Sequence, residues 1–230
     1  MHLKYNFPFS LLFLCICTIA QAQDMSGYHI ADHLLIKEAD KQLKMGPEAE
    51  AVEGTPYLDE TFMTGHVYSR YGDYKGISMR YNIYEDHIEF RQKDLIYILD
   101  PDLMIKKVDL GAQVLVVENY EFRMKEQPGF LTLLDSGKVT LLSKKVVTYR
   151  EQQPPKALES APTPARYSRL PDAYYYKIGT GEVMKVQNIK KMISSFPDKH
   201  QELTQFAKKE KLSHKKEADL IALVRHYNKL

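Results

Sequence analysis

The chain has 230 residues, of which 44% are apolar and 27% charged, and its 32 lysines and arginines nearly balance 30 aspartates and glutamates. This is the composition of a globular protein, and it excludes a low-complexity or disordered chain. Both cysteines, Cys15 and Cys17, lie within the first 22 residues. Once that segment is removed, a thiolate nucleophile, a disulfide and a cysteine-ligated metal centre are all excluded.

Residues 1–22 have the pattern of a secretory signal peptide. Lys4 supplies the positive charge, residues 11–20 are apolar, and Ala20-Gln21-Ala22 forms a small-residue cleavage site. The apolar stretch is too short for a membrane-spanning helix, which needs about 20 residues. We therefore expect cleavage after Ala22, no transmembrane segment afterwards, and an exported protein that is periplasmic, envelope-associated or secreted.

Residues 23–53 are expected to contain an N-terminal helix and a connector. Apolar residues recur at helical spacing over positions 26–45, and Gly46-Pro47 ends the run.

Two histidines of this predicted helix, His29 and His33, lie one turn apart and are spaced to ligate a metal ion. With Asp32 they approach the His-x-x-Glu-His order of inverted zinc peptidases. The acid differs and a third ligand is not evident, so a solvent-exposed helix is the favoured interpretation. A metal-dependent hydrolase that uses this pair is a further alternative to the two functions described below.

Residues 54–151 are expected to form an antiparallel β domain, because apolar and polar residues alternate in short segments separated by turns rich in Gly, Asp and Pro. The predicted strands are residues 62–70, 76–84, 87–93, 95–99, 104–110, 114–122, 130–134 and 138–150. This spacing predicts an antiparallel meander that forms a sandwich or a partial barrel. The apolar phase of the last strand shifts near Ser143-Lys144, where we expect a bulge.

The rest of the chain divides into two parts. Residues 152–172 contain five prolines and are expected to form an irregular Pro-rich crossing. Residues 173–230 are expected to form a hairpin, Tyr174–Ile178 with Val183–Val186, followed by two to three amphipathic helices as a C-terminal cap. The fold class is therefore α+β, and mainly β.

A candidate interaction surface overlaps this boundary, where cations are interleaved with aromatic rings. Arginine and tyrosine are enriched at protein contact surfaces. The alternative is ordinary packing of this segment. The predicted surface residues are Arg166, Tyr167, Arg169, Tyr174, Tyr175, Tyr176 and Lys177.

The sequence lacks a nucleophile elbow, a phosphate-binding loop and a dinucleotide-binding loop. We therefore predict no enzyme activity and no cofactor. The favoured function is a protein-interaction or assembly module with an envelope protein as partner. The first alternative is a carrier that holds an apolar ligand, such as an acyl chain, in a curled sheet. A lipid or another anionic surface is the alternative partner of the basic C-terminal helices, and export argues against nucleic acid.

Two stretches together resemble exported proteins of unknown function that are common in Bacteroidota. The first contains Tyr57-Leu58-Asp59-Glu60, Gly65-x-Val67-Tyr68 and Met79-Arg80-Tyr81-Asn82-Ile83-Tyr84; the second runs from Phe196-Pro197-Asp198-Lys199 to Tyr227-Asn228. The resemblance covers about residues 54–230 and implies a Gram-negative envelope or secreted location. It implies no catalytic or binding residue.

Overall fold

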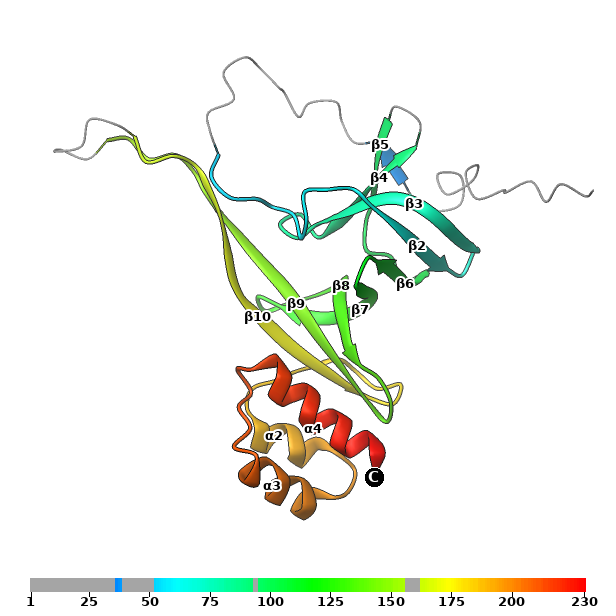
Figure 1. Cartoon of the computed structure of the whole chain (residues 1–230), viewed down its shortest axis with the longest axis vertical. Coiled ribbons are helices and arrows are strands. Elements are labelled where there is room, and N and C mark those ends of the chain that lie inside the picture. Colours follow the sequence, from blue (N-terminus) through cyan, green and yellow to red (C-terminus); the bar gives the residue numbers. More distant parts are fainter. Residues whose placement is uncertain (1–35, 39–51, 93–94, 156–161) are drawn as a thin grey trace, which may run out of the picture.

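All eight segments in which apolar and polar residues alternate form strands. The structure is a computed structural model, and it describes residues 36–38, 52–92, 95–155 and 162–230. The prediction of a mainly antiparallel β protein with helices at its C-terminal end is confirmed. Helices and strands lie at opposite ends of an elongated molecule (Figure 1).

The strands are β1 (Ile36–Glu38), β2 (Met63–Ser69), β3 (Asp73–Asn82), β4 (His87–Gln92), β5 (Leu95–Leu99), β6 (Ile105–Leu110), β7 (Gln113–Phe122), β8 (Lys125–Asp135), β9 (Val139–Arg150), β10 (Arg166–Ile178) and β11 (Met184–Lys185). The helices are α2 (Ile189–Ser195), α3 (His200–Lys209) and α4 (Glu217–Lys229). The predicted helix over residues 26–45 lies outside the described residues except at Ile36–Glu38, which form β1 instead and pair with β5.

The strands form one sheet in the order β1-β5-β4-β3-β2-β6-β7-β8-β9-β10-β11, so the expected meander is interrupted once. β5 and β6 follow each other along the chain but are not neighbours in the sheet. β6 pairs with β2, so that β4, β3 and β2 lie between β5 and β6. Strands lie about 4.8 Å apart, so a flat sheet would separate β5 from β6 by about 19 Å. Only residues 100–104 join them, and these fold into a turn in which Ile105 N donates to Asp102 O. The β2–β6 part of the sheet must therefore curl.

The curled part encloses the first apolar core. Met79 of β3, Ile88 of β4, Val108 of β6 and Leu115 of β7 are fully buried in it. On each of these strands the next core residue lies two positions further along, as Tyr81 does after Met79, so one face of the strand points inside. The apolar residues of the alternating pattern in the sequence are therefore the residues that form this core.

The strands β9 and β10 form a long two-stranded segment, the β9–β10 ribbon, which connects the curled end to the helical end (Figure 1). A bulge is found opposite the predicted position, but its extra residue belongs to β10. Leu170 pairs with Val146 and Ala173 with Lys144, so Pro171 and Asp172 together face Lys145. Proline has no N–H for the ladder, and a bulge is where a strand tolerates it. β10 thus begins at Arg166, inside the predicted Pro-rich crossing.

The three helices cover the lower end of the ribbon and form a second core with it. Val139 and Leu141 of β9 pack there with Leu203 of α3 and Leu223 of α4. The side-chain amide of Asn228 pairs with the backbone of Val139, accepting from its N and donating to its O, both at 2.9 Å. The predicted hairpin is also confirmed, because β10 pairs with β11. In the described part of the chain, every helix is too short or too polar to cross a membrane.

Candidate functional site

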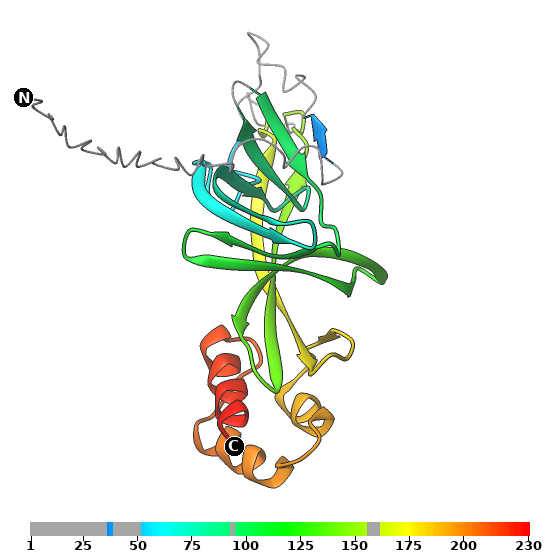
Figure 2. The same cartoon turned by 90° about the vertical axis from the view of Figure 1, so that its right-hand side faces the viewer.

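The sheet splits where β8 and β9 part, and a pocket opens in the fork. The two strands pair only from Thr132 and Ser143 toward their common hairpin. Beyond that point β8 stays with β7, while β9 continues with β10 toward the curled core. Figure 2 shows the β7–β8 hairpin crossing the β9–β10 ribbon at this level.

The pocket has a volume of about 370 Å³ and is open to the surface. We call it the Lys144 pocket. It is lined by the β3–β4 turn, the tip of the β7–β8 hairpin and the free edge of β9, with the residues Ile83, Tyr84, Glu85, Asp86, Tyr120, Phe122, Arg123, Lys125, Gln127, Lys144, Lys145, Val146 and Val147.

Lys144 forms the floor of the pocket and is only 3% exposed. Its Nζ lies 2.6 Å from Asp86 Oδ1, and it also donates to Tyr81 Oη at 3.2 Å and to Phe130 O at 3.1 Å. These three contacts use all three N–H groups of the ammonium. Burial lowers the pKa of Lys144, and the Asp86 charge opposes this shift. Lys144 therefore forms a buried ion pair with Asp86 and has no N–H group left for another partner.

Asp86 is placed by the tight turn between β3 and β4, where its backbone has φ +55°. Aspartate is among the residues that adopt this left-handed conformation most readily. Its Oδ1 accepts from the Tyr81 hydroxyl at 2.6 Å. Burial raises the pKa of Tyr81 well above its usual value, and the Asp86 charge adds to this. The phenol therefore stays protonated and donates to the carboxylate.

Tyr120 supplies a buried hydroxyl without a hydrogen-bond partner in the described part of the chain. The residue is 1% exposed and lines the pocket. Gly129 lies beside it, and a Cβ there would sit 2.7 Å from Asp86 Oδ2 and 3.1 Å from Tyr120 Oη. Asp86 and Tyr120 therefore pack directly against the backbone at position 129, where only glycine fits without displacing them.

Two exposed cations, Arg123 and Lys125, flank the mouth of the pocket, and neither has an ion-pair partner among the described residues. Arg123 and Met124 form the two-residue turn of the β7–β8 hairpin with φ of +52° and +64°. Such a turn normally takes Asn-Gly, because positive φ strains other residues. The chain thus retains an arginine at a strained position beside the pocket.

Three tyrosines meet beside the pocket, and we call them the tyrosine face. The ring centroids of Tyr149 and Tyr167 are 4.8 Å apart, and Tyr84 lies 5.4 Å from Tyr167 and 6.2 Å from Tyr149. Tyr84 is 42% and Tyr149 39% exposed. Burial of Tyr167 raises its pKa, with further increases from its two tyrosine neighbours.

The predicted surface residues are spread over the whole of β10. Tyr167 belongs to the tyrosine face, and Arg169 follows two positions later and is exposed. Arg166 is also exposed, but alternation directs it to the opposite face of the strand, where it lies 3.7 Å from Glu53.

The remaining four predicted residues lie lower on the ribbon. Tyr174 packs against the helical core, and Tyr175 is buried with its hydroxyl donating to Glu121 O at 3.0 Å. Tyr176 is buried with its hydroxyl 2.8 Å from Ser195 Oγ. Lys177 forms an ion pair with Glu118. Of the seven predicted residues, only Tyr167 and Arg169 therefore contribute to the surface around the tyrosine face, and Tyr175 packs beneath the pocket against Tyr120.

The predicted metal ligands His29 and His33 lie outside the described residues. Within the described ranges, no group of three or more His, Cys, Asp or Glu side chains is arranged to hold a metal ion.

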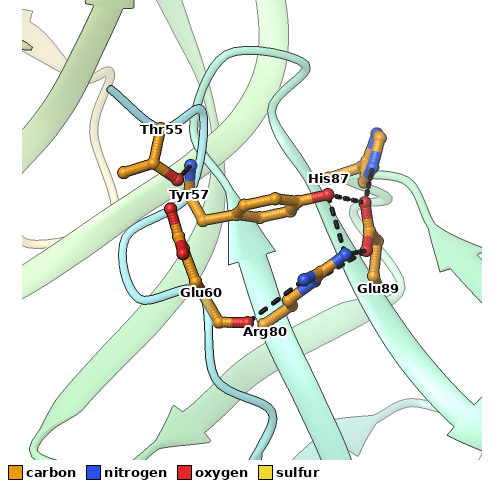
Figure 3. Close-up of polar contacts among 6 residues, drawn as sticks. All are labelled: Thr55, Tyr57, Glu60, Arg80, His87 and Glu89. Atoms are coloured by element: carbon orange, nitrogen blue, oxygen red, sulfur yellow. Dashed lines mark hydrogen bonds and ion pairs between the residues drawn. The ribbon is translucent and has the colours of Figure 1, made fainter. Parts of the chain in front are cut away.

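In a second polar cluster, centred on Arg80 and Glu89, the side chains satisfy one another through mutual hydrogen bonds and an ion pair (Figure 3). Arg80 Nη2 donates to Glu89 Oε2 at 2.6 Å and to Tyr57 Oη at 2.8 Å, and Tyr57 Oη donates to Glu89 Oε1 at 3.0 Å. His87 Nε2 lies 3.5 Å from the same Oε1. Burial acts to raise the pKa of Glu89, but contacts with His87, Arg80 and Tyr57 outweigh it and lower that pKa to about 2. This cluster holds the segment before β2 against the sheet.

Sequence reasoning missed Lys144, Asp86, Tyr81 and Tyr120. One local signal was present, because Lys144 lies at the phase shift of an otherwise apolar strand. Comparison with protein-family models, curated proteins and solved structures finds no match.

Proposed function

We propose that this protein is a non-catalytic binding protein of the cell envelope, and that it contacts a protein partner through the tyrosine face. The observation that supports this is the stack of Tyr84, Tyr149 and Tyr167, with Arg169 exposed beside it. Tyrosine and arginine dominate the energetics of protein contacts. The mutual ring contacts already fix these side chains, so binding costs less conformational entropy.

The lipid-carrier alternative needs an apolar cavity, and the geometry favours it less. In the described part of the chain, Met79, Ile88 and Val108 fill the interior of the curled sheet. The Lys144 pocket is bordered by several charged side chains. A protein contact surface is therefore the better interpretation.

We also propose that residues 1–22 direct export and are removed, as their sequence pattern predicts. The N-terminal residue of the protein purified from its native host tests this directly. A chain that begins at Gln23 supports export, and a chain that still begins at Met1 contradicts it.

Site-specific photocrosslinking tests the contact surface. A benzophenone amino acid replaces Tyr149 in the full chain, expressed in the native host. The matched control position is Tyr71, which is 57% exposed in the turn after β2. We expect one protein, of fixed mass, to be crosslinked from position 149 and not from position 71.

Substitutions then test the tyrosine face itself. Tyr167→Ala and Arg169→Glu are each expected to lower the crosslinking yield from position 149 at least fivefold, and Arg70→Glu serves as the charge control. Equal crosslinking from positions 149 and 71, or a yield that neither substitution changes, would refute the proposed surface.

A further inference from the structure

The fork between β8 and β9 leaves one edge of β9 without a neighbouring strand. Thr132 and Ser143 are the last residues at which the two strands pair, and beyond Ser143 only β10 pairs with β9 among the described residues. A strand edge without a partner carries a row of free N–H and C=O groups, which is a template for another chain. The Lys144 pocket opens onto this edge at residues 144–147.

The hydrogen bonds of β10 show which residues of β9 point to the free edge. Tyr167 N donates to Glu53 O, so the backbone of Tyr167 points away from β9. Tyr167 lies opposite Tyr149, and in an antiparallel pair hydrogen-bonded and non-bonded residues alternate. Lys145, Val147 and Tyr149 therefore direct their backbone N–H and C=O groups into the fork, where no other described residue bonds to them. We call residues 145–149 the β9 edge.

The edge of β8 that faces the same fork is closed, in contrast to the β9 edge. Phe130 N donates to Asp86 Oδ1 at 3.4 Å, and Phe130 O accepts from Lys144 Nζ at 3.1 Å. Two residues earlier Pro128 has no N–H, and proline is one device by which an edge strand avoids pairing. The β9 edge contains no proline, and Val147 is only 6% exposed although a buried backbone normally has its polar groups paired. An added strand would pair them.

The side chains around the fork indicate the charge of the segment that fits the β9 edge. Arg123 and Lys125 at the mouth of the pocket, and Arg150 at the end of the edge, are exposed without an ion-pair partner among the described residues. Of the two carboxylates that line the pocket, one is already paired with Lys144 and the other belongs to Glu85. The excess of cations favours a partner segment with acidic side chains.

We propose that the protein partner adds an extended acidic segment to the β9 edge, in the place beside β9 that β8 leaves, with acidic side chains toward the cations of the pocket mouth. In strand addition the main-chain hydrogen bonds provide affinity, and pockets for alternate side chains provide specificity. Ile83, Phe122 and Val146 line the same pocket and suit apolar residues that alternate with the acidic ones. This inference rests on the proposed function, because Tyr149 belongs to both the β9 edge and the tyrosine face.

A short peptide tests the β9 edge in the full chain. The probe is a heptapeptide with blocked ends in which glutamate and valine alternate, and the control peptide has glutamine in place of glutamate. We expect calorimetry to show that the glutamate peptide binds at least fivefold more tightly, and the difference to shrink at high ionic strength. Absence of binding at millimolar concentration, or equal affinity of the two peptides, would overturn the proposal.

Hydrogen exchange measured by NMR distinguishes an added strand from contact through side chains alone. The bound glutamate peptide should slow exchange of the amides of Lys145, Val147 and Tyr149 at least tenfold, while the residues between them, which already bond to β10, should change little. Two further peptides carry N-methyl groups on alternate amides, one in each phase. Only one of them should lose binding, because every second residue of an added strand bonds to β9. Binding without slower exchange, or equal loss for both peptides, would contradict strand addition.

Charge variants test the cations at the mouth. Arg123→Gln combined with Lys125→Gln should lower the affinity for the glutamate peptide to that for the glutamine peptide. The control, Lys208→Gln with Lys209→Gln, removes the same charge from exposed positions of α3 and should leave the affinity for the glutamate peptide unchanged. An equal effect of the two double variants would refute the proposed direction of the acidic side chains.

The two proposals fail in different ways. If the glutamate peptide adds to the β9 edge but no protein is crosslinked from position 149, the protein-contact proposal fails and the assignment of the edge stands. If a protein is crosslinked from position 149 but the peptide neither binds nor slows exchange, the proposed function stands and strand addition is refuted.

Discussion

Replacing Lys144 by Met is expected to lower the free energy of unfolding by about 3 kcal/mol, because it leaves the Asp86 carboxylate without its cation. The ammonium lies 2.6 Å from Asp86 Oδ1, and the lysine side chain is 4% exposed. Removing one member of a buried ion pair typically costs about 3–5 kcal/mol. The lower end applies here, because the Asp86 side chain is 18% exposed and keeps its bond from the Tyr81 hydroxyl.

The matched variant replaces both charges, as Lys144→Met with Asp86→Asn. Asparagine tolerates the left-handed backbone at position 86 and still accepts from the Tyr81 hydroxyl. Because no unpaired carboxylate remains, the double variant should be more stable than Lys144→Met alone by about 2 kcal/mol.

Urea unfolding of the wild type, both single variants and the double variant completes a double-mutant cycle. The chain contains no tryptophan, so tyrosine fluorescence and far-ultraviolet circular dichroism report the transition. Equal m-values are required for the comparison. If Lys144→Met stays within about 0.5 kcal/mol of the wild type, or if the two single effects simply add, the ion pair contributes no coupling and the reasoning is refuted.

Three further predictions concern positions outside the ion pair. The pKa of Glu89 is lowered from its usual 4.5 to about 2. The ionised Glu89 side chain therefore contributes its full stabilisation above about pH 4.5, and this stabilisation is lost as the pH falls through 2. Between pH 6 and pH 2.5, the free energy of unfolding measured in urea should fall by about 2 kcal/mol more for the wild type than for Glu89→Gln. An equal fall in the two proteins would contradict this. Gly137→Ala should destabilise by about 2 kcal/mol, because its Cβ would meet Asn228 Cγ at 2.6 Å. Asn228→Ala should lower the melting temperature of the protein by a comparable amount. The variant that combines Gly137→Ala with Asn228→Ala should lose less stability than the two single losses added together, and full additivity would contradict a shared contact. Arg123→Asn with Met124→Gly should raise stability by about 1–2 kcal/mol, since both positions have positive φ, and an unchanged urea midpoint would show that the turn is not strained.

The strands could be predicted because their signal is local. Ile77, Met79 and Tyr81 alternate with polar residues, and this period alone indicates a strand with one buried face. The strand order could not be predicted in the same way. The pairing of β2 with β6 joins Val67 to Val108, and no local pattern specifies which distant strand fills that place.

The candidate site was only partly predictable for the same reason. Tyr167 and Arg169 stand out by composition, but Tyr175 and Tyr176 of the same segment are buried, because the strand lies between a sheet and the helices. The Lys144–Asp86 pair joins residues from β9 and the β3–β4 turn. Its partners become neighbours only where β8 and β9 part, a consequence of long-range topology.

The strand β9 belongs to both ends of the molecule at once. Leu141 is buried among the helices and Val147 in the curled core, six residues apart and therefore about 20 Å along one strand. Neither end can melt without releasing a strand that the other end needs. The two lobes are therefore expected to form a single cooperative unit, in which damage to the helical cap lowers the population of the intact pocket far above it.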